Sequence, residues 1–235
     1  MTNKKYDFYS DTHLYIHFYN NIKSISNENE FILIKETIIK KKEKYEVLFN
    51  IINKIEKNLS NKTESKIIFI SNAGLTLISP WFPMLFKRLG YLDKDGKFKD
   101  VSTKIRAIFV LQYILFEDDD IAFKESDLSL NRILTASPFY VPLPQKLTLT
   151  DKEKNTVHEM LLGIKANWDK IKNTSLNGFK ESFLKRSGRI EIDKEKNCII
   201  YVDNKSYDML LDSLPWSYKL IRYSWLKKII TVQWK

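Results

Sequence analysis

One stretch of the sequence combines the residue types found in catalytic and phosphate-binding loops. Residues 172–190, KNTSLNGFKESFLKRSGRI, place asparagine, threonine, serine and glycine among several cations. The same residue types can also begin a helix, because an N-cap hydroxyl accepts a hydrogen bond from a free N–H group of the first turn. Thr174 and Ser175 are the candidates for that cap. A capped helix therefore explains the start of this stretch without catalysis.

The remainder of the stretch has the pattern of an amphipathic helix. Three apolar residues are expected to face inward and three cations are expected to lie outside. The inward residues are Phe179, Phe183 and Leu184, and the outward residues are Lys180, Lys185 and Arg186. Gly188 follows at a position where glycine commonly ends a helix. We predict a helix with a basic outer face that Gly188 ends.

Other chemical motifs are incomplete. His13 and His17 are four residues apart, as a metal pair on one helix face requires, but no cysteine or third histidine is nearby. His158 and Glu159 begin like a zinc-protease helix, but the fifth position is Leu162 rather than histidine. The sequence has neither a glycine-rich phosphate loop nor a serine nucleophile elbow. We therefore predict no catalytic residue, no metal site and no cofactor, in a protein that is not an enzyme.

The net charge of +10 is concentrated in two stretches of the 235-residue chain. Residues 172–190 contain five basic residues and one acidic residue, and residues 215–235 contain five basic residues and no acidic residue. Such clusters bind nucleic acid, an anionic membrane surface or an acidic protein, and charge alone does not choose among these partners. The sequence has no run of eighteen apolar residues and no signal peptide, which predicts a cytoplasmic protein without membrane insertion. The single cysteine, Cys198, excludes an intramolecular disulfide.

Hydrophobic spacing predicts a mostly helical chain. Residues 36–59 show three-and-four spacing, typical of an amphipathic helix, and the polar residues 60–65 are the best linker candidate. Residues 66–90 are apolar nearly all round and are therefore expected to be buried, with Gly90 as a helix C-cap. Residues 101–118 form a second densely apolar helix.

Local signals define the elements that follow. The sequence DKDG at residues 93–96 predicts a turn, and Thr150 with Glu153 three positions later predicts a capping box at the start of a helix. In residues 188–204 the apolar residues recur with a period of two, which predicts two strands around a charged turn. Residues 227–235 predict a last strand. We predict an α+β fold, predominantly α-helical, with a small antiparallel sheet near the C-terminus.

Several segments between Ser71 and Trp234 resemble a known family. The most specific are NAGL followed by Pro80 and Pro83, KNTS followed by FKESFLKRSG, and LPWS followed by the closing VQW. In this order they resemble the conserved C-terminal module of the contractile injection system tape-measure proteins, which belong to phage-tail-like particles. We expect two parts, an N-terminal extension with the amphipathic helix at residues 1–65 and the helical module at residues 66–235.

The resemblance implies a structural component rather than an enzyme. It implies the inner tube, spike or baseplate proteins of the particle as partners, and an oligomer inside the assembled particle. Only some seventy residues precede the resembling segments, and fully helical they would span about 100 Å. No sustained heptad run is present to keep such a segment extended. We therefore do not expect this chain to measure tube length.

Cations and tryptophans in the two basic stretches are the candidates for partner binding, because aromatic and arginine side chains dominate many interfaces. These residues are Lys180, Lys185, Arg186, Arg189, Trp216, Lys219, Arg222 and Trp225. The two tryptophans can equally be core residues. Two alternatives remain: a basic nucleic-acid-binding protein, and a chaperone-like adaptor for loading of tube or effector subunits.

Overall fold

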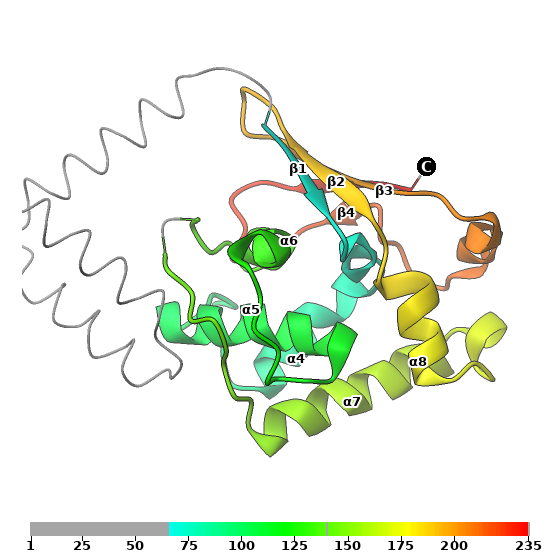
Figure 1. The fold of residues 1–235 in the computed structure, drawn as a ribbon, viewed down its shortest axis with the longest axis horizontal. Helices are drawn as coiled ribbons and strands as arrows, with labels where there is room; N and C mark the ends of the chain where they lie inside the picture. The colour runs from blue at the N-terminus through cyan, green and yellow to red at the C-terminus, as the bar shows by residue number, and fades with distance from the viewer. Residues whose placement is uncertain (1–65, 140, 235) are drawn as a thin grey trace, which may run out of the picture. The chain divides into compact units, whose positions relative to one another are not determined.

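A helical layer and a five-stranded sheet make up the part of the chain that the structure, a computed structural model, describes (Figure 1). The described residues are 66–139 and 141–234. All elements named below lie in one compact unit, residues 64–141 and 147–235. The predicted helix at residues 36–59 and the histidine pair at residues 13 and 17 lie outside the described residues, and the proposed boundary at residue 65 stays a prediction.

The elements follow the chain in a simple order. The strands are β1 (Lys66–Ile70), β2 (Gly188–Ile192), β3 (Cys198–Val202), β4 (Leu220–Ile221) and β5 (Ile230–Trp234). The α-helices are α4 (Phe82–Arg88), α5 (Val101–Phe116), α6 (Ser129–Leu134), α7 (Asp151–Ala166) and α8 (Leu176–Phe179). The 3-10 helices are η2 (Ala73–Trp81), η3 (Glu125–Leu128), η4 (Asp169–Ile171) and η6 (Ser206–Ser213). The element η5 (Lys180–Leu184) is a short π-helix. The α+β class and its helical predominance are confirmed.

The sheet has the order β1-β2-β3-β5-β4 and mixed strand directions. Three of its pairs are antiparallel, but β3 and β5 run parallel. The expectation of a purely antiparallel sheet is therefore wrong for this pair. Alternating apolar residues show which strand faces are buried but not the direction in which a strand enters the sheet. The expectation also missed β1, because KIIFI has no alternation that separates a strand from a buried helix.

Three of the predicted helix caps are confirmed. Thr150 and Glu153 form the predicted capping box at the start of α7, and Ser175 Oγ accepts a hydrogen bond from the N–H of Gly178 at 3.0 Å. Gly90, one residue after the C-cap Leu89 of α4, has a φ of +76°, and the N–H of Tyr91 donates to the carbonyl of Phe86. These bonds satisfy backbone groups that a helix end leaves without partners.

Gly188 does not end a helix, contrary to the prediction. It is the first residue of β2, and a Cβ atom there would lie 2.2 Å from the carbonyl oxygen of Tyr201 and 2.9 Å from Cβ of Ala73. Glycine is needed because β2 packs tightly between β3 and η2. Gly74 serves the same purpose, since its Cβ would lie 2.0 Å from the carbonyl oxygen of Phe183.

A buried amide network joins the sheet to the helical layer. Asn72, two residues after the end of β1, donates from Nδ2 to Oδ1 of Asn131 on α6 at 2.9 Å. Asn131 donates to the carbonyl of Ile108 at 3.0 Å and to Oε1 of Gln112 at 2.9 Å, both on α5. Buried polar groups with partners in three elements favour one arrangement of those elements. The first residue of the NAGL segment therefore has a structural role.

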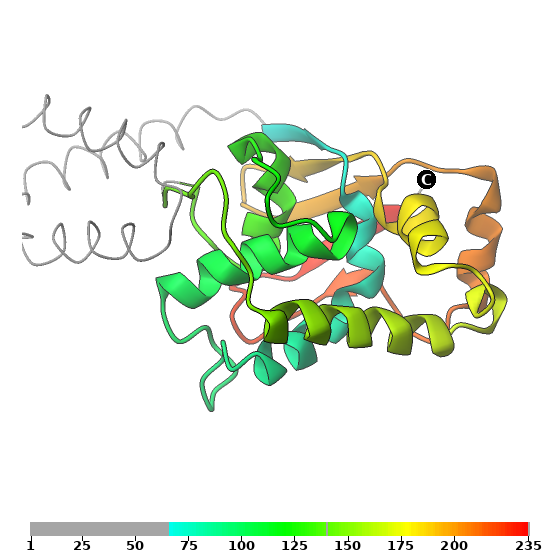
Figure 2. The ribbon, with the colours of Figure 1, turned by 60° about the horizontal axis from the view of Figure 1, so that its bottom comes forward.

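A second polar cluster joins α5, α7 and Tyr91 in the segment after α4; α5 and α7 lie side by side in Figure 2. Arg106 on α5 contacts the carboxylate of Glu153 through Nε at 2.6 Å and Nη2 at 2.5 Å. The hydroxyl of Tyr91 and the N–H of Thr150 also donate to this carboxylate. Burial alone would raise the pKa of Glu153, but these donors outweigh it and lower the pKa.

Candidate partner-binding surface

Two of the predicted outward cations are buried. Lys180 is 3% exposed and its ammonium lies 2.6 Å from a carboxylate oxygen of Glu117. Arg186 is 1% exposed and makes two contacts of 2.7 Å with the carboxylate of Asp208. The predicted basic outer face is therefore wrong at these two positions. The chain widens to a π-turn in η5, which changes the direction of the side chains after Phe179 relative to a regular helix.

Lys185 is the third predicted outward cation, and it is only half-buried. Its ammonium pairs with Glu181 at 2.5 Å and lies 5.0 Å from the ring centroid of Phe116. Lys185 can therefore contact a partner, but its charge is already partly compensated within the fold.

The two candidate tryptophans differ in burial. Trp225 is 8% exposed, its Nε1 donates to the carbonyl of Leu134 at 2.9 Å, and its ring stacks on Tyr223. Trp225 is thus a core residue. Trp216 is half-buried, with Nε1 donating to the carbonyl of Leu77 at 2.9 Å and its ring against that of Trp81. The LPWS segment is thereby attached to η2.

Lys219 and Arg222 are exposed and flank the short edge strand β4. Leu220 between them is 63% exposed. This edge therefore combines exposed cations with an exposed apolar side chain. Among the eight candidates, Lys219 and Arg222 fit the expectation of an outward cation best.

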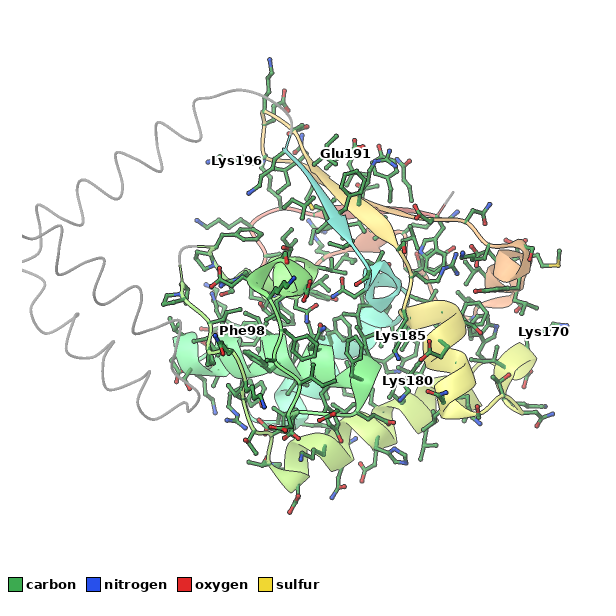
Figure 3. The ribbon with its side chains drawn as sticks, in the orientation of Figure 1. Phe98, Lys170, Lys180, Lys185, Glu191 and Lys196 are labelled. Atoms are coloured by element: carbon green, nitrogen blue, oxygen red, sulfur yellow. The ribbon has the colours of Figure 1, made fainter. Side chains whose placement is uncertain are left out.

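The remaining candidate, Arg189, lies on an open face of the sheet. Residues that pair directly across neighbouring strands point to the same face. One such row consists of Phe69, Arg189, Tyr201 and Gln233, and the next consists of Ile67, Glu191, Ile199, Thr231 and Leu220. Every residue of both rows is exposed or half-buried, whereas the opposite face contacts η2 and α6. Figure 3 shows Glu191 on the side of β2 away from the helical layer.

The centre of the open face is ordered by polar and aromatic contacts. Nε of Arg189 lies 2.7 Å from a carboxylate oxygen of Glu191, and its guanidinium lies 4.2 Å from the ring centroid of Tyr201. Phe69, which pairs with Arg189, is 79% exposed. An exposed phenylalanine beside a fixed arginine and tyrosine has the composition of an interface centre.

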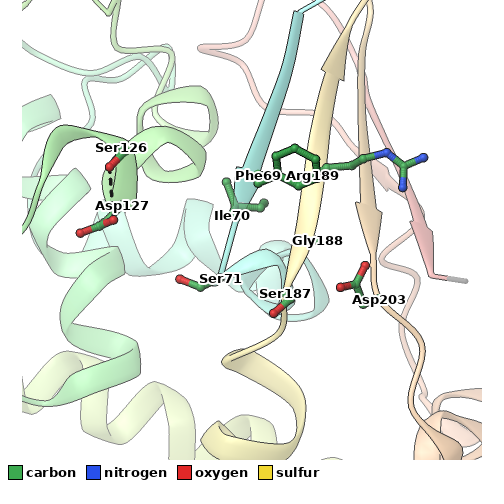
Figure 4. Close-up of a pocket in the computed structure, with 9 residues that line it drawn as sticks. All are labelled: Phe69, Ile70, Ser71, Ser126, Asp127, Ser187, Gly188, Arg189 and Asp203. Atoms are coloured by element: carbon green, nitrogen blue, oxygen red, sulfur yellow. Dashed lines mark hydrogen bonds between the residues drawn. The ribbon is translucent and has the colours of Figure 1, made fainter.

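A pocket of about 480 Å³ lies at the end of the sheet where β1 ends and β2 begins (Figure 4). Phe69 and Arg189 line it from the strands, Asp127 lines it from η3, and Asp203 follows β3. Three serines add hydroxyl groups to its wall; they are Ser71, Ser126 and Ser187. The lining combines hydroxyl, carboxylate and guanidinium groups with two apolar side chains, and it contains no histidine that could act as a base beside a serine.

The described residues do not support catalysis by a bound metal ion or by a cysteine thiolate. They contain no group of three or more histidine, cysteine, aspartate or glutamate side chains that could hold a metal ion. Burial raises the pKa of the Cys198 thiol to about 11, so it is protonated at neutral pH and a poor nucleophile. No described helix is both long and apolar enough to cross a membrane.

The sequence reasoning missed the open face because its residues come from five separated strands. Phe69, Ile67 and Leu220 are ordinary apolar residues in their own segments. Only the strand pairing places them in rows beside Arg189 and Tyr201. The available signal was the unusual density of apolar residues in KIIFI at residues 66–70.

The fold and surface define a two-layer α+β protein whose sheet has one covered face and one open face. The family model of the contractile injection system tape measure protein matches residues 16–234, and the chain therefore belongs to this family. The resemblance found in the sequence is confirmed, and the match extends further toward the N-terminus than residue 71. Comparisons with curated proteins and with solved structures give no match. The family is a structural one and supports a structural or assembly role.

Proposed function

We propose that this chain is an assembly component at the inner tube, spike or baseplate of a contractile injection particle, and that it does not act as an enzyme. The observation that carries the proposal is the family match over residues 16–234. The open sheet face adds a surface suited to another particle protein. We propose that its partners are the tube, spike or baseplate proteins, and that it assembles into the particle from the cytoplasm as an oligomer.

The geometry supports docking through the open face rather than through the predicted basic helix. The side chains of Lys180, Arg186 and Trp225 are buried and have partners within the fold. Their replacement would therefore change the stability of the protein before it changed binding. Phe69 and Arg189 instead present an apolar and a charged group outside the core. Lys219 and Arg222, at the β4 edge of the sheet, extend this surface with exposed cations.

The experiment compares particles from cells that carry the normal gene, a deletion or single variants. Phe69→Asp should reduce incorporation of the protein into particles, because it places a charge at the proposed docking centre. Met209→Asp is the matched control, since Met209 on η6 is 74% exposed and lies outside both cross-strand rows. Normal particle yield, length and firing in the deletion strain would contradict the proposed function. Equal incorporation of both variants would contradict the docking surface alone.

Nucleic-acid binding is the second candidate, and the exposed cations around β4 favour it. Lys219, Arg222, Lys227 and Lys228 lie within ten residues of one another and are all exposed. A true nucleic-acid complex loses affinity steeply as salt rises, because bound cations release counterions. A gel shift that weakens with salt and is lost in Lys219→Glu would support this function. Co-purification with free effector subunits but not with particles would instead indicate the adaptor role.

A further inference from the structure

Among the described strands, β1 forms one edge of the sheet, and only β2 pairs with it. Soluble proteins usually protect an edge strand with charges, proline, a bulge or a covering segment. The sequence of β1 is KIIFI, with Lys66 as its only charged residue. Ile67 is 51% exposed and Phe69 is 79% exposed. Such a strand is a template for pairing with another strand.

We propose that the strand that pairs with β1 is the β1 strand of a second copy of this chain. The two strands run antiparallel around a twofold axis at Ile68, and two five-stranded sheets join into one. Such a contact is isologous, because each copy contributes the same residues. The proposal concerns the free protein and does not depend on the proposed role in the particle.

The register follows from centring all five residues of β1 on Ile68. Ile67 of each copy then lies opposite Phe69 of the other, and Lys66 lies opposite Ile70. Ile67 and Phe69 both belong to the open face, so two apolar pairs form there. Cross-strand pairs of a β-branched and an aromatic residue are among the favourable ones.

Charge complementarity supports a second copy over an unrelated strand. Lys66 and Ile70 point to the face opposite Phe69, toward the helical layer, since they alternate with Ile67 and Phe69. Asp127 of η3 lines the pocket together with Ile70 and lies on this side of β1 (Figure 4). In the proposed register, Lys66 of one copy therefore approaches Asp127 of the second copy. The twofold axis produces this pair twice.

Among the described residues of one copy, neither Lys66 nor Asp127 forms an ion pair. The ammonium of Lys66 lies 5.0 Å from the ring centroid of Phe139, which is a weak attraction. Asp127 accepts hydrogen bonds from the N–H of Lys124 at 3.2 Å and from the hydroxyl of Ser126 at 3.3 Å. Both residues are exposed. One β1 edge thus has a cation at its start and an anion beside its end, as self-pairing requires.

The test is sedimentation of the full chain over a range of protein concentrations. We expect a reversible monomer–dimer equilibrium, because pairing of one short strand covers less surface than a typical stable dimer. Lys66→Asp and Asp127→Lys should each weaken dimerisation by about tenfold, since both pairs change from attraction to repulsion. Phe69→Asp should also weaken it. Lys170→Asp, on η4 at the far end of the unit from β1 (Figure 3), is the control and should have no effect.

Charge exchange distinguishes this dimer from one that forms through a different surface of the chain. The double variant Lys66→Asp with Asp127→Lys should dimerise again, and an equal mixture of the two single variants should form mixed dimers. Circular dichroism and the melting temperature show whether each variant is folded. A chain that is monomeric at every concentration would overturn the proposal. If neither the double variant nor the mixture regained dimerisation, the proposal would also be overturned.

Discussion

Removal of the Glu153 carboxylate should cost much stability for a small change in shape. Its side chain is 5% exposed and receives hydrogen bonds from Arg106, Tyr91 and Thr150. Glu153→Gln keeps the volume but removes the negative charge, and one of its terminal atoms becomes a donor. The half-buried guanidinium of Arg106 then loses both of its contacts with this carboxylate.

The expected loss is about 3 kcal/mol in the free energy of unfolding, the lower end for breaking a buried ion pair. For a protein of this size, that loss lowers the melting temperature by about 10 °C. Glu159→Gln is the matched control on the same helix. Its carboxylate lies 2.5 Å from Arg88, but both side chains are about half exposed, so solvent screening keeps the loss below about 1 kcal/mol. Urea unfolding at neutral pH measures the loss of stability in both variants.

The same carboxylate should produce a pH dependence of stability. The hydrogen bonds and the Arg106 charge hold the pKa of Glu153 in the folded protein below its value in the unfolded chain, despite burial. The contribution is therefore fully present above the unfolded pKa, near 4.5, and is lost as the pH falls through the lower folded pKa. The difference in stability between the normal chain and Glu153→Gln should shrink below that pH. Equal stability of the two chains at pH 7 would refute this reasoning.

Two further predictions concern close packing and the buried arginine. Gly188→Ala should destabilise the protein by about 1–3 kcal/mol or more, because the added Cβ lies 2.2 Å from a β3 carbonyl oxygen, whereas Gly163→Ala meets no atom within 4 Å and should be tolerated. Thermal unfolding compares them, and equal melting temperatures would contradict the close approach. Arg186→Lys should cost about 3 kcal/mol, because one ammonium cannot replace the two guanidinium contacts to Asp208. The control is Arg222→Lys, because Arg222 is exposed. Urea unfolding should give a lower midpoint for Arg186→Lys than for the control, and equal midpoints would contradict the prediction.

Sequence patterns predicted the features that depend on neighbours along the chain. The capping box of Thr150 and Glu153, the N-cap at Ser175 and the left-handed Gly90 depend on contacts within a few residues. Residue types report such contacts directly, because the donor and acceptor are held close by the local backbone. The α+β class followed from the change in apolar period after the basic stretch.

The sequence could not show which of the cations are buried. Lys180 and Arg186 look like exposed cations on a helix, yet their partners, Glu117 and Asp208, are 63 and 22 residues away. Burial of a cation depends on whether the fold brings a carboxylate to it, and spacing within one helix contains no information on that. Gly188 was misassigned for a similar reason. The crowding that requires a glycine comes from Tyr201 and Ala73 in other elements.

The sequence by itself determined the family, the helical character, the caps and the absence of a complete catalytic motif among its residues. The tertiary structure decided which basic and aromatic residues are available to a partner. It buried Lys180, Arg186 and Trp225 and placed Arg189 on an open sheet face. It also left the apolar strand β1 at a sheet edge. The physical reason is that exposure depends on contacts between distant segments, whereas caps and helices depend on contacts between near neighbours.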